Sequence, residues 1–368
     1  MIFTCSKEIL NEAVSIVSKA VSTKSNTPVL ECILISASNH FIKLSGSDFD
    51  LAIESEIPAE VEEEGKIAVN ARFFGDIIRK AAGETVYFES DDECRVKIKC
   101  ANMKIETTGM PSDEFPEIEN IESEHRIVMK DTMLKSMIKQ TLFAVGTDES
   151  KMILTGSLFE IKDNVLNVVS LDRFRLALRR ETLEDETEDV SFVIPSKSLG
   201  EINKIIKDED IDVTIGVSEN KVQFEIGCYK ITSRLLEGEF LDYNQILPKE
   251  SKIYVIADVK PLCDAIERAA LIIENETTKY PVKLSVETDR INLSCVSRIG
   301  KMDDTVFVET KGDNLEIGFN YRFLLDALKA CECEKVSVEF NTMLNPCIIK
   351  PVEGEKFIYI VLPVKMRG

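Results

Sequence analysis

The chain has 368 residues, of which 44% are hydrophobic, so it is long enough to form two or three domains, each with its own core. It contains no run of about eighteen apolar residues, and its first residues lack the basic start and long apolar stretch of a secretory signal, so we expect a cytoplasmic protein without a membrane partner. A formal net charge of −20 argues against a protein that holds nucleic acid by bulk electrostatic attraction, although it does not exclude a local basic lining.

In chain order, one pattern occurs three times with a period near 125 residues. Each repeat opens with a helix whose apolar residues stand four apart, and the sequence predicts these helices over residues 5–21, 130–145 and 258–273. Strands broken by turns follow, as in residues 33–57 and 157–181. The hairpin turns are predicted at Asn39, Asp163-Asn164 and Asp289.

Each repeat continues with a second helix, and these helices begin at Asn70, Pro195 and Asn320. Their starts lie 125 residues apart, and each helix leads into a strand of alternating apolar residues. We therefore predict an α+β fold of three repeated domains, each with two helices packed on one face of antiparallel strands. The expected domains span residues 1–122, 126–248 and 252–368, with linkers around residues 118–125 and 247–252.

No residue pattern indicates an active site. Walker-type, GxGxxG and GxSxG motifs are missing, His40 and His125 stand outside any nucleophile or zinc motif, and the acidic runs at 60–64 and 184–188 are typical of surface loops. The cysteines, among them Cys32, Cys100, Cys228 and Cys295, are scattered through apolar patterns and are expected to be reduced core residues, and the Cys331/Cys333 pair lacks partners for a metal. We expect no enzyme, no cofactor and no metal.

Basic residues recur in register on the second helix of each repeat. Two helical positions that are seven residues apart, and hence on one face, are basic in all three copies. Such a face suits a duplex phosphate backbone, contacted without reading bases. The predicted DNA-contacting residues are Lys24, Arg72, Arg79, Lys197, Lys204, Arg322 and Lys329.

Six segments give the chain a resemblance to the bacterial DNA polymerase sliding clamp, the β subunit of DNA polymerase III. They are TPVL from Thr27, LTGSLFE from Leu154, SLDRFRLA from Ser170, EGEFLDYNQILP from Glu237, GFNYRFLLDAL from Gly318 and VLPVK from Val361. The resemblance implies a head-to-tail homodimer that closes into a ring around duplex DNA, with helices lining the hole, and that tethers the replicative polymerase and other DNA-processing proteins. It also implies an ATP-dependent clamp loader, because the chain has no nucleotide site of its own.

The resemblance further implies that polymerases and repair proteins bind through short peptides in an apolar pocket between the second and third domains. Matched residue by residue, the pocket consists of Leu154, Leu171, Arg173, Phe174, Arg175, Leu176, Leu241, Gln245, Ile246, Phe323, Ile360, Leu362, Pro363 and Val364. Leu171, Arg173, Phe174 and Leu241 depart from the family pattern of threonine, a small residue, histidine or tyrosine, and proline. The alternative for Leu176 and Ile360 is a place in the domain core.

The same resemblance places the ring seam at the strand of residues 103–108 and a third-domain strand and helix of the partner. The residues expected there are Lys104, Ile105, Leu271, Ile272, Asp303 and Asp304, with Lys104 opposite Asp303 or Asp304. Edge-strand pairing and apolar contact should dominate this seam. A divergent clamp-like peptide-binding scaffold that does not encircle DNA is the alternative function, whereas an enzyme that uses the inter-domain cleft has no candidate catalytic group.

Overall fold

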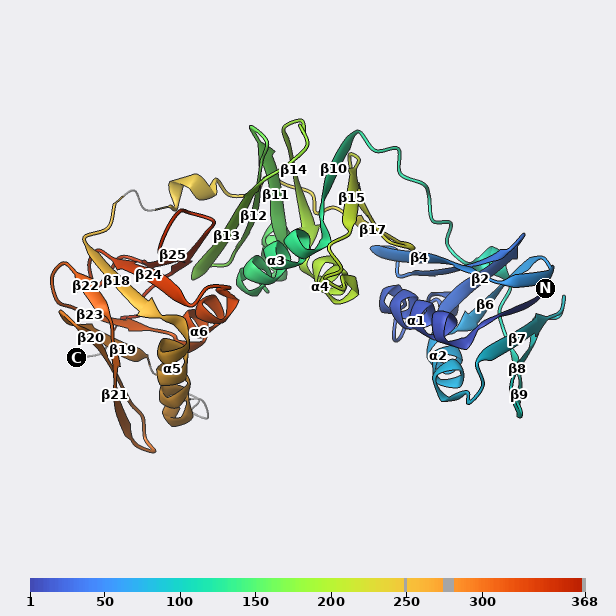
Figure 1. Cartoon of the computed structure of the whole chain (residues 1–368), viewed down its shortest axis with the longest axis horizontal. Helices are drawn as coiled ribbons and strands as arrows, with labels where there is room; N and C mark the ends of the chain where they lie inside the picture. The colour runs from blue at the N-terminus through green and yellow to red at the C-terminus, as the bar shows by residue number, and fades with distance from the viewer. Residues whose placement is uncertain (248–249, 274–280, 366–368) are drawn as a thin grey trace. The chain divides into compact units, whose positions relative to one another are not determined.

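The structure is a computed structural model that describes residues 1–247, 250–273 and 281–365 (Figure 1). The predicted helix pairs are confirmed. The first helix of each repeat is α1 (Lys7–Val17), α3 (Asp131–Thr141) or α5 (Val259–Ile273), and the second is α2 (Ala71–Lys80), α4 (Ser196–Ile205) or α6 (Tyr321–Ala330). The second helices begin 125 residues apart, as the repeat predicts. In α2 and α6 the preceding asparagine, Asn70 or Asn320, caps the helix by accepting a backbone N–H in the first turn.

The strands form four antiparallel sheets. A five-stranded sheet has the order β5 (Glu60–Glu63), β1 (Ile2–Ser6), β7 (Thr85–Ser90), β8 (Arg95–Cys100) and β9 (Met103–Thr108). A four-stranded sheet has the order β21 (Lys301–Phe307), β20 (Arg290–Val296), β19 (Val282–Val286) and β23 (Leu315–Phe319).

The two larger sheets each combine strands from two repeats. The eight-stranded sheet has the order β10 (His125–Lys130), β15 (Asp212–Val217), β16 (Lys221–Ile226), β17 (Tyr229–Arg234), β4 (Leu51–Pro58), β3 (Phe41–Ser47), β2 (Cys32–Ser38) and β6 (Gly65–Asn70). The nine-stranded sheet has the order β14 (Val190–Pro195), β11 (Gly156–Lys162), β12 (Val165–Leu171), β13 (Arg175–Thr182), β26 (Phe357–Val361), β25 (Cys347–Pro351), β24 (Lys335–Phe340), β18 (Ile253–Asp258) and β22 (Glu309–Lys311). The pairings β17–β4 and β13–β26 thus join neighbouring repeats.

By contact density the chain forms two compact units, which divide the middle repeat between them. Unit 1 consists of Met1–Thr132 and Glu201–Leu235, and unit 2 consists of Met133–Gly200 and Leu236–Gly368. The division follows from the sheets, because half of the middle repeat pairs with the first repeat through β17–β4 and the other half pairs with the third through β13–β26. The domain boundaries expected from the sequence remain a prediction, and Pro248 and Lys249 of the expected second linker lie outside the described residues.

Each unit buries its helices against sheets on a core of aliphatic and aromatic side chains. In unit 1, Phe3 stacks on Phe88 with ring centroids 4.9 Å apart, and Phe74 of α2 meets Phe88 edge-on at 6.1 Å. In unit 2, the apolar faces of α5 and α6 pack on the strands of the third repeat, around the buried residues Ile266 and Leu328. The predicted fold class is confirmed, and the apolar stripes of the helices supply the core.

Some local features differ from expectation. Residues 60–63 form the short edge strand β5 rather than a loop, His125 begins strand β10 rather than lying in a linker, and Cys228 is exposed rather than buried. The predicted turns are confirmed, and Asn39, Asp163 and Asn164 have positive φ angles of 52°, 49° and 62°. None of the helices within the described ranges has the length and apolarity that crossing a membrane requires.

Candidate functional site

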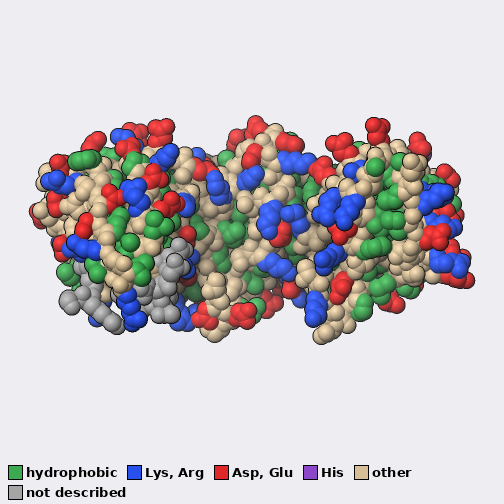
Figure 2. All heavy atoms as spheres, turned by 90° about the horizontal axis from the view of Figure 1, so that it is seen from below, with side chains coloured by type: hydrophobic (Ala, Val, Ile, Leu, Met, Phe, Trp, Pro, Cys, Tyr) green, Lys and Arg blue, Asp and Glu red, His purple; other side chains and the backbone are tan. Residues whose placement is uncertain are grey.

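The six basic helix residues lie on the exposed faces of their helices. We call Arg72, Lys197 and Arg322 the first-row cations, and Arg79, Lys204 and Lys329 the second-row cations. Every one of them is exposed. Helices α2 and α6 show why, because each buries its opposite face, for example Phe74 in α2 and Leu324 in α6. Figure 2 shows numerous Lys and Arg side chains on the face that it draws, with Asp and Glu side chains among them. Lys24 is also exposed, in the segment that follows α1.

The second-row cations are all engaged by carboxylates of their own chain. Arg79 pairs with Asp76 at 2.5 Å, Lys204 with Glu201 at 2.8 Å, and Lys329 with Glu267 at 2.7 Å. Hydrogen bonding to Glu267 raises the pKa of the Lys329 ammonium. Exposed pairs of this kind contribute about 0–1 kcal/mol to stability. Sequence reasoning identified the cations but missed their partners, although Asp76 and Glu201 stand three residues before them, the spacing of neighbours on a helix surface.

A second region, within unit 2, brings together the residues predicted for the peptide pocket. Leu154, Leu171, Leu176 and Ile360 belong to one buried cluster that also contains Tyr243. Leu176 and Ile360 are both 2% exposed and face each other as register partners on β13 and β26. These side chains therefore form the core below the surface.

Above this core lie exposed apolar side chains. Phe174 is 51% exposed, Leu241 51% and Ile246 41%, while Leu362 and Val364 are also exposed. Gln245 is exposed as well, and its amide donates to a carboxylate oxygen of Asp242 at 2.9 Å. Apolar side chains that water reaches in such number are typical of a surface that binds a partner. Pro363 lies half-buried between Leu362 and Val364.

The C-terminal segment is fixed across this region by backbone hydrogen bonds. The N–H of Leu362 donates to the carbonyl oxygen of Phe174 at 2.8 Å, and the N–H of Val364 donates to that of Gly318 at 2.9 Å. Residues from three separate parts of the sequence therefore share one surface of unit 2.

Arg175 is half-buried beside this surface, and its guanidinium group contacts two carboxylates and two aromatic rings. Its Nη1 lies 2.5 Å from Asp326 and its Nε lies 3.1 Å from Asp172. The same group lies over the ring of Phe323, 4.6 Å from the centroid, and near that of Phe143 at 5.7 Å. With these partners Arg175 ties strand β13 to helix α6. Sequence reasoning missed Phe143 and Asp326, because no spacing rule connects them to Arg175.

Two of the residues that depart from the family pattern, Phe174 and Arg173, make contacts with other side chains. Phe174 stacks on Phe323 with ring centroids 5.7 Å apart and an interplanar angle of 20°. Arg173 forms an exposed ion pair with Asp148. The stacked rings of Phe174 and Phe323 therefore form one edge of the surface.

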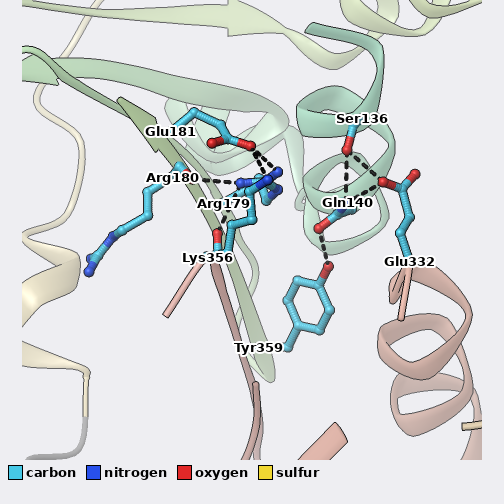
Figure 3. Close-up of polar contacts among 8 residues, drawn as sticks. All are labelled: Ser136, Gln140, Arg179, Arg180, Glu181, Glu332, Lys356 and Tyr359. Atoms are coloured by element: carbon cyan, nitrogen blue, oxygen red, sulfur yellow. Dashed lines mark hydrogen bonds and ion pairs between the residues drawn. The ribbon is translucent and has the colours of Figure 1, made fainter. Parts of the chain in front are cut away.

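The border between the second and third repeats also contains a partly buried polar network (Figure 3). The amide nitrogen of Gln140 donates to Ser136 and to Glu332, and the Tyr359 hydroxyl donates to the Gln140 carbonyl oxygen at 3.3 Å. Beside it, Arg179 donates to Glu181 and to the carbonyl oxygens of Arg180 and Lys356. None of these contacts was predicted from the sequence.

The residues predicted for the ring seam lie on two edge strands and one helix. Lys104 and Ile105 are on β9, at the free edge of the five-stranded sheet, and Asp303 and Asp304 are on β21, at the free edge of the four-stranded sheet. Asp303 pairs with Lys301 at 2.7 Å and Asp304 with Arg268 at 2.5 Å, so each already has a cation of its own chain.

The helix residues of the predicted seam differ in burial. Leu271 is 69% exposed at the end of α5, whereas Ile272 packs partly against the core. Free strand edges and an exposed leucine are features of an association surface.

In the described part of the chain no group of three or more His, Cys, Asp or Glu side chains is arranged to hold a metal ion. Cys331 and Cys333, the pair singled out in the sequence, are free thiols whose pKa values are raised by burial.

Comparisons with known proteins agree with this architecture along the whole chain. Family models of the N-terminal, central and C-terminal domains of the DNA polymerase III beta subunit match residues 1–119, 128–242 and 244–365. The beta sliding clamp of Bacillus subtilis is 36% identical over 378 residues, covering 99% of this chain and all of the relative. That of Staphylococcus epidermidis is 33% identical, covering 99% of both chains.

Solved structures give the same result. The crystal structure of the Bacillus subtilis DNA polymerase sliding clamp is 34% identical, covers 100% of both chains and has a TM-score of 0.96. A putative DNA polymerase III beta subunit from Eubacterium rectale is 36% identical, with the same coverage and a TM-score of 0.95. The chain therefore belongs to the DNA polymerase III beta subunit family, and it is a DNA sliding clamp, a processivity factor with no catalytic role of its own.

Proposed function

We propose that two copies of the chain associate head to tail into a closed ring around duplex DNA, with the exposed helix faces toward the phosphates. The observation that carries this proposal is the recurrence of exposed first-row and second-row cations at the same helical positions in all three repeats. Contacts of this kind depend on charge and not on base sequence. A closed ring stays on DNA by topology even when each contact is weak, which reconciles DNA encirclement with a net charge of −20.

The proposed seam pairs β9 of one subunit with β21 of the other. Both strands have a free edge, so backbone hydrogen bonds are available on each side, and Leu271 adds exposed apolar surface. An ion pair between Lys104 and Asp303 or Asp304 requires the aspartate to leave Lys301 or Arg268, so it contributes little to the seam.

The proposed docking surface for polymerases and repair proteins is the apolar region of unit 2 around Phe174, Leu241 and Leu362. A short extended or turned peptide with apolar side chains fits exposed apolar residues above a closed core. Because Arg175 is already engaged by Asp326 and Phe323, we assign it to positioning the surface rather than to binding the peptide. An ATP-dependent loader is the proposed means of opening the ring, and the cytoplasm is the proposed location.

The test is retention on circular against linearised nicked plasmid, with loader and ATP supplied, followed by gel filtration in moderate salt. Retention on circles with loss from linear ends is the expected result, because only a topological link depends on DNA ends. Equal loss from both, while a control clamp is loaded in the same reaction, contradicts encirclement and favours the scaffold that binds peptides without encircling DNA.

The seam has a separate test. Lys104→Glu together with Ile105→Asp places charge on the free edge of β9, and sedimentation should show a monomer where the unaltered chain is a dimer. The matched control is Lys43→Glu with Phe41→Asp on β3. This strand already pairs with β2 on one side and β4 on the other, so it has no free edge for a second subunit. A dimer that persists in the β9 variant contradicts the proposed seam.

A further inference from the structure

We propose that Asp76, Glu201 and Glu267 compete with the DNA phosphates for the second-row cations. Each carboxylate forms an ion pair with one of these cations, and the pairs lower the affinity of the ring for duplex DNA. The inference rests on the proposed function, because it requires the helix faces to meet DNA. It assigns a role to acidic residues that the family resemblance does not include.

The observation is that all three repeats bring a carboxylate to the same cation position. In α2 and α4 the carboxylate stands three residues earlier on the same helix, at 2.5 Å and 2.8 Å from its cation. In the third repeat the corresponding position on α6 is Asp326, which pairs with Arg175 at 2.5 Å, and Glu267 of the neighbouring helix α5 reaches Lys329 at 2.7 Å instead. The same pairing is thus reached by two different routes, which is unexpected if the acids only stabilise single helices.

The cations remain accessible to a ligand. The side chains of Arg79, Lys204 and Lys329 are 67%, 59% and 56% exposed. Water screens a pair of this kind, so a phosphate oxygen replaces the carboxylate at little cost. The displaced carboxylate then stays beside the DNA and repels it, so each such contact is weaker than one made by a free cation.

Glu201 holds two cations and is the strongest competitor of the three. Its Oε1 lies 2.8 Å from Lys204 and its Oε2 lies 3.6 Å from Lys19, which follows α1. Arg72 in the first row, by contrast, forms no ion pair with a described residue. In α2, therefore, one cation is free for phosphate and the other is held back by Asp76.

The expected consequence is a shallow dependence of DNA affinity on salt. A free cation that binds a phosphate releases counterions from the DNA, and the logarithm of affinity then falls with that of salt by about 0.9 for each contact. A cation that exchanges a carboxylate for a phosphate gains less affinity. Weak contacts of nearly equal energy also keep the barrier to sliding low.

The test compares two triple variants with the same change in charge. D76N/E201Q/E267Q removes the three competitors. D91N/E287Q/E316Q removes three carboxylates that pair with Arg95, Arg290 and Lys283 at 2.8 Å, 2.9 Å and 2.9 Å, on strands and turns rather than helices. Binding of a fluorescent duplex is measured by anisotropy over a series of salt concentrations, and diffusion of the loaded ring is measured by single-molecule tracking.

The helix variant should bind duplex about tenfold more tightly at low salt, with a steeper salt dependence and slower diffusion, while the control variant stays close to the unaltered chain. Equal strengthening in both variants shows an effect of net charge alone and overturns the inference, as does an unchanged helix variant. If the triple variant is less stable, the single variants D76N and E267Q, at carboxylates that are 45% and 47% exposed, decide the question by the same readouts. Failure of the proposed function is distinguishable, because the unaltered chain itself is then not retained on circular plasmid.

Discussion

The two borders between repeats are built on the same backbone plan and stabilised by different side chains. Both join the sheets of neighbouring repeats by one antiparallel pairing, β17–β4 in unit 1 and β13–β26 in unit 2. The first border leaves a hollow of about 260 Å³ lined by isoleucines such as Ile9 and Ile226. Its polar contacts include the ion pair of Glu12 with Lys207 and the hydrogen bond from Tyr229 to Glu12 at 3.3 Å.

The second border contains packed aromatic rings. Tyr359 is fully buried, stacks with Phe357 at 4.8 Å and meets Phe143 edge-on at 5.3 Å, and its hydroxyl donates to Gln140 (Figure 3). The proposed docking surface lies on this border. Continuity of a sheet joins two repeats at both borders, whereas packed rings and buried hydrogen bonds hold the second border in one arrangement.

The largest expected effect is that of Arg179→Ala at the second border. Arg179 is 4% exposed and donates to Glu181 and to two backbone carbonyl groups, so its loss removes these three hydrogen bonds. Glu181 keeps the Lys356 ammonium at 2.8 Å, and the Lys356 carbonyl oxygen keeps the Arg180 N–H at 2.9 Å. We expect the free energy of unfolding to fall by about 3 kcal/mol, because the hydrogen bonds of a charged group and the packing of a large buried side chain are lost. Urea denaturation followed by circular dichroism measures it, and Arg95→Ala, at an exposed pair, is the control with an expected loss below about 1 kcal/mol. If both variants lose a similar free energy of unfolding, the buried contacts of Arg179 do not stabilise the protein more than the exposed pair of Arg95.

Phe174→Ala should separate docking from stability. Its ring is half exposed and stacks on Phe323, so its removal opens no cavity in the core but takes an aromatic anchor from the surface. A clamp-binding peptide from the partner polymerase should bind with a loss of about 2 kcal/mol, or about thirtyfold in Kd, measured by calorimetry. Phe41→Ala, at a comparably exposed ring on β3, should leave the affinity unchanged. An unaltered Kd in the Phe174 variant excludes this surface as the binding site.

Tyr359→Phe tests the polar part of the second border alone. The substitution keeps the ring and removes the hydroxyl that donates to Gln140, so one buried acceptor loses its donor. We expect a loss of about 1–2 kcal/mol in the free energy of unfolding. Tyr254→Phe, at an exposed ring on β18, should have no measurable effect. A neutral Tyr359 variant shows that packing of the rings, and not the network, stabilises the border.

The smallest effect is expected at the first border, from Glu12→Gln. The hydrogen bond from Lys207 lowers the pKa of the Glu12 carboxyl from its ordinary 4.5. A lowered pKa in the folded state stabilises the fold above the ordinary value, and this contribution is lost as the pH falls through the folded-state pKa. At pH 7 the variant should therefore lose less than about 1 kcal/mol relative to the unaltered chain. Well below pH 4.5 the two chains should be equally stable, and Glu8→Gln on the same helix controls for loss of a carboxylate. If the free energies of unfolding of the two chains differ by the same amount at both pH values, the ion pair of Glu12 with Lys207 is not the cause.

Local structure was predictable from particular residues. Apolar residues four apart indicated the helices, the repeat period placed helix starts at Asn70 and Asn320, and Asp163-Asn164 indicated a hairpin turn. The structure adds that both asparagines cap their helices. The exposed cation rows followed from the repeat period, because residues seven apart share a helix face. The acidic edge strand β5 was missed, since Glu60–Glu63 has the composition of a loop and is a strand only through its pairing with β1.

The sequence by itself determined the threefold repeat, the helices and turns, and the faces on which cations and apolar residues lie, because these depend on spacing within a few residues along the chain. Only the tertiary structure decided that β17 pairs with β4 and β13 with β26, that Arg175 lies against Phe323 and Asp326, and that Glu267 reaches Lys329 from another helix. Those contacts join residues far apart in sequence. Their partners are set by how whole sheets and helices pack, and a strand's pattern of apolar residues specifies its buried face but not its neighbour.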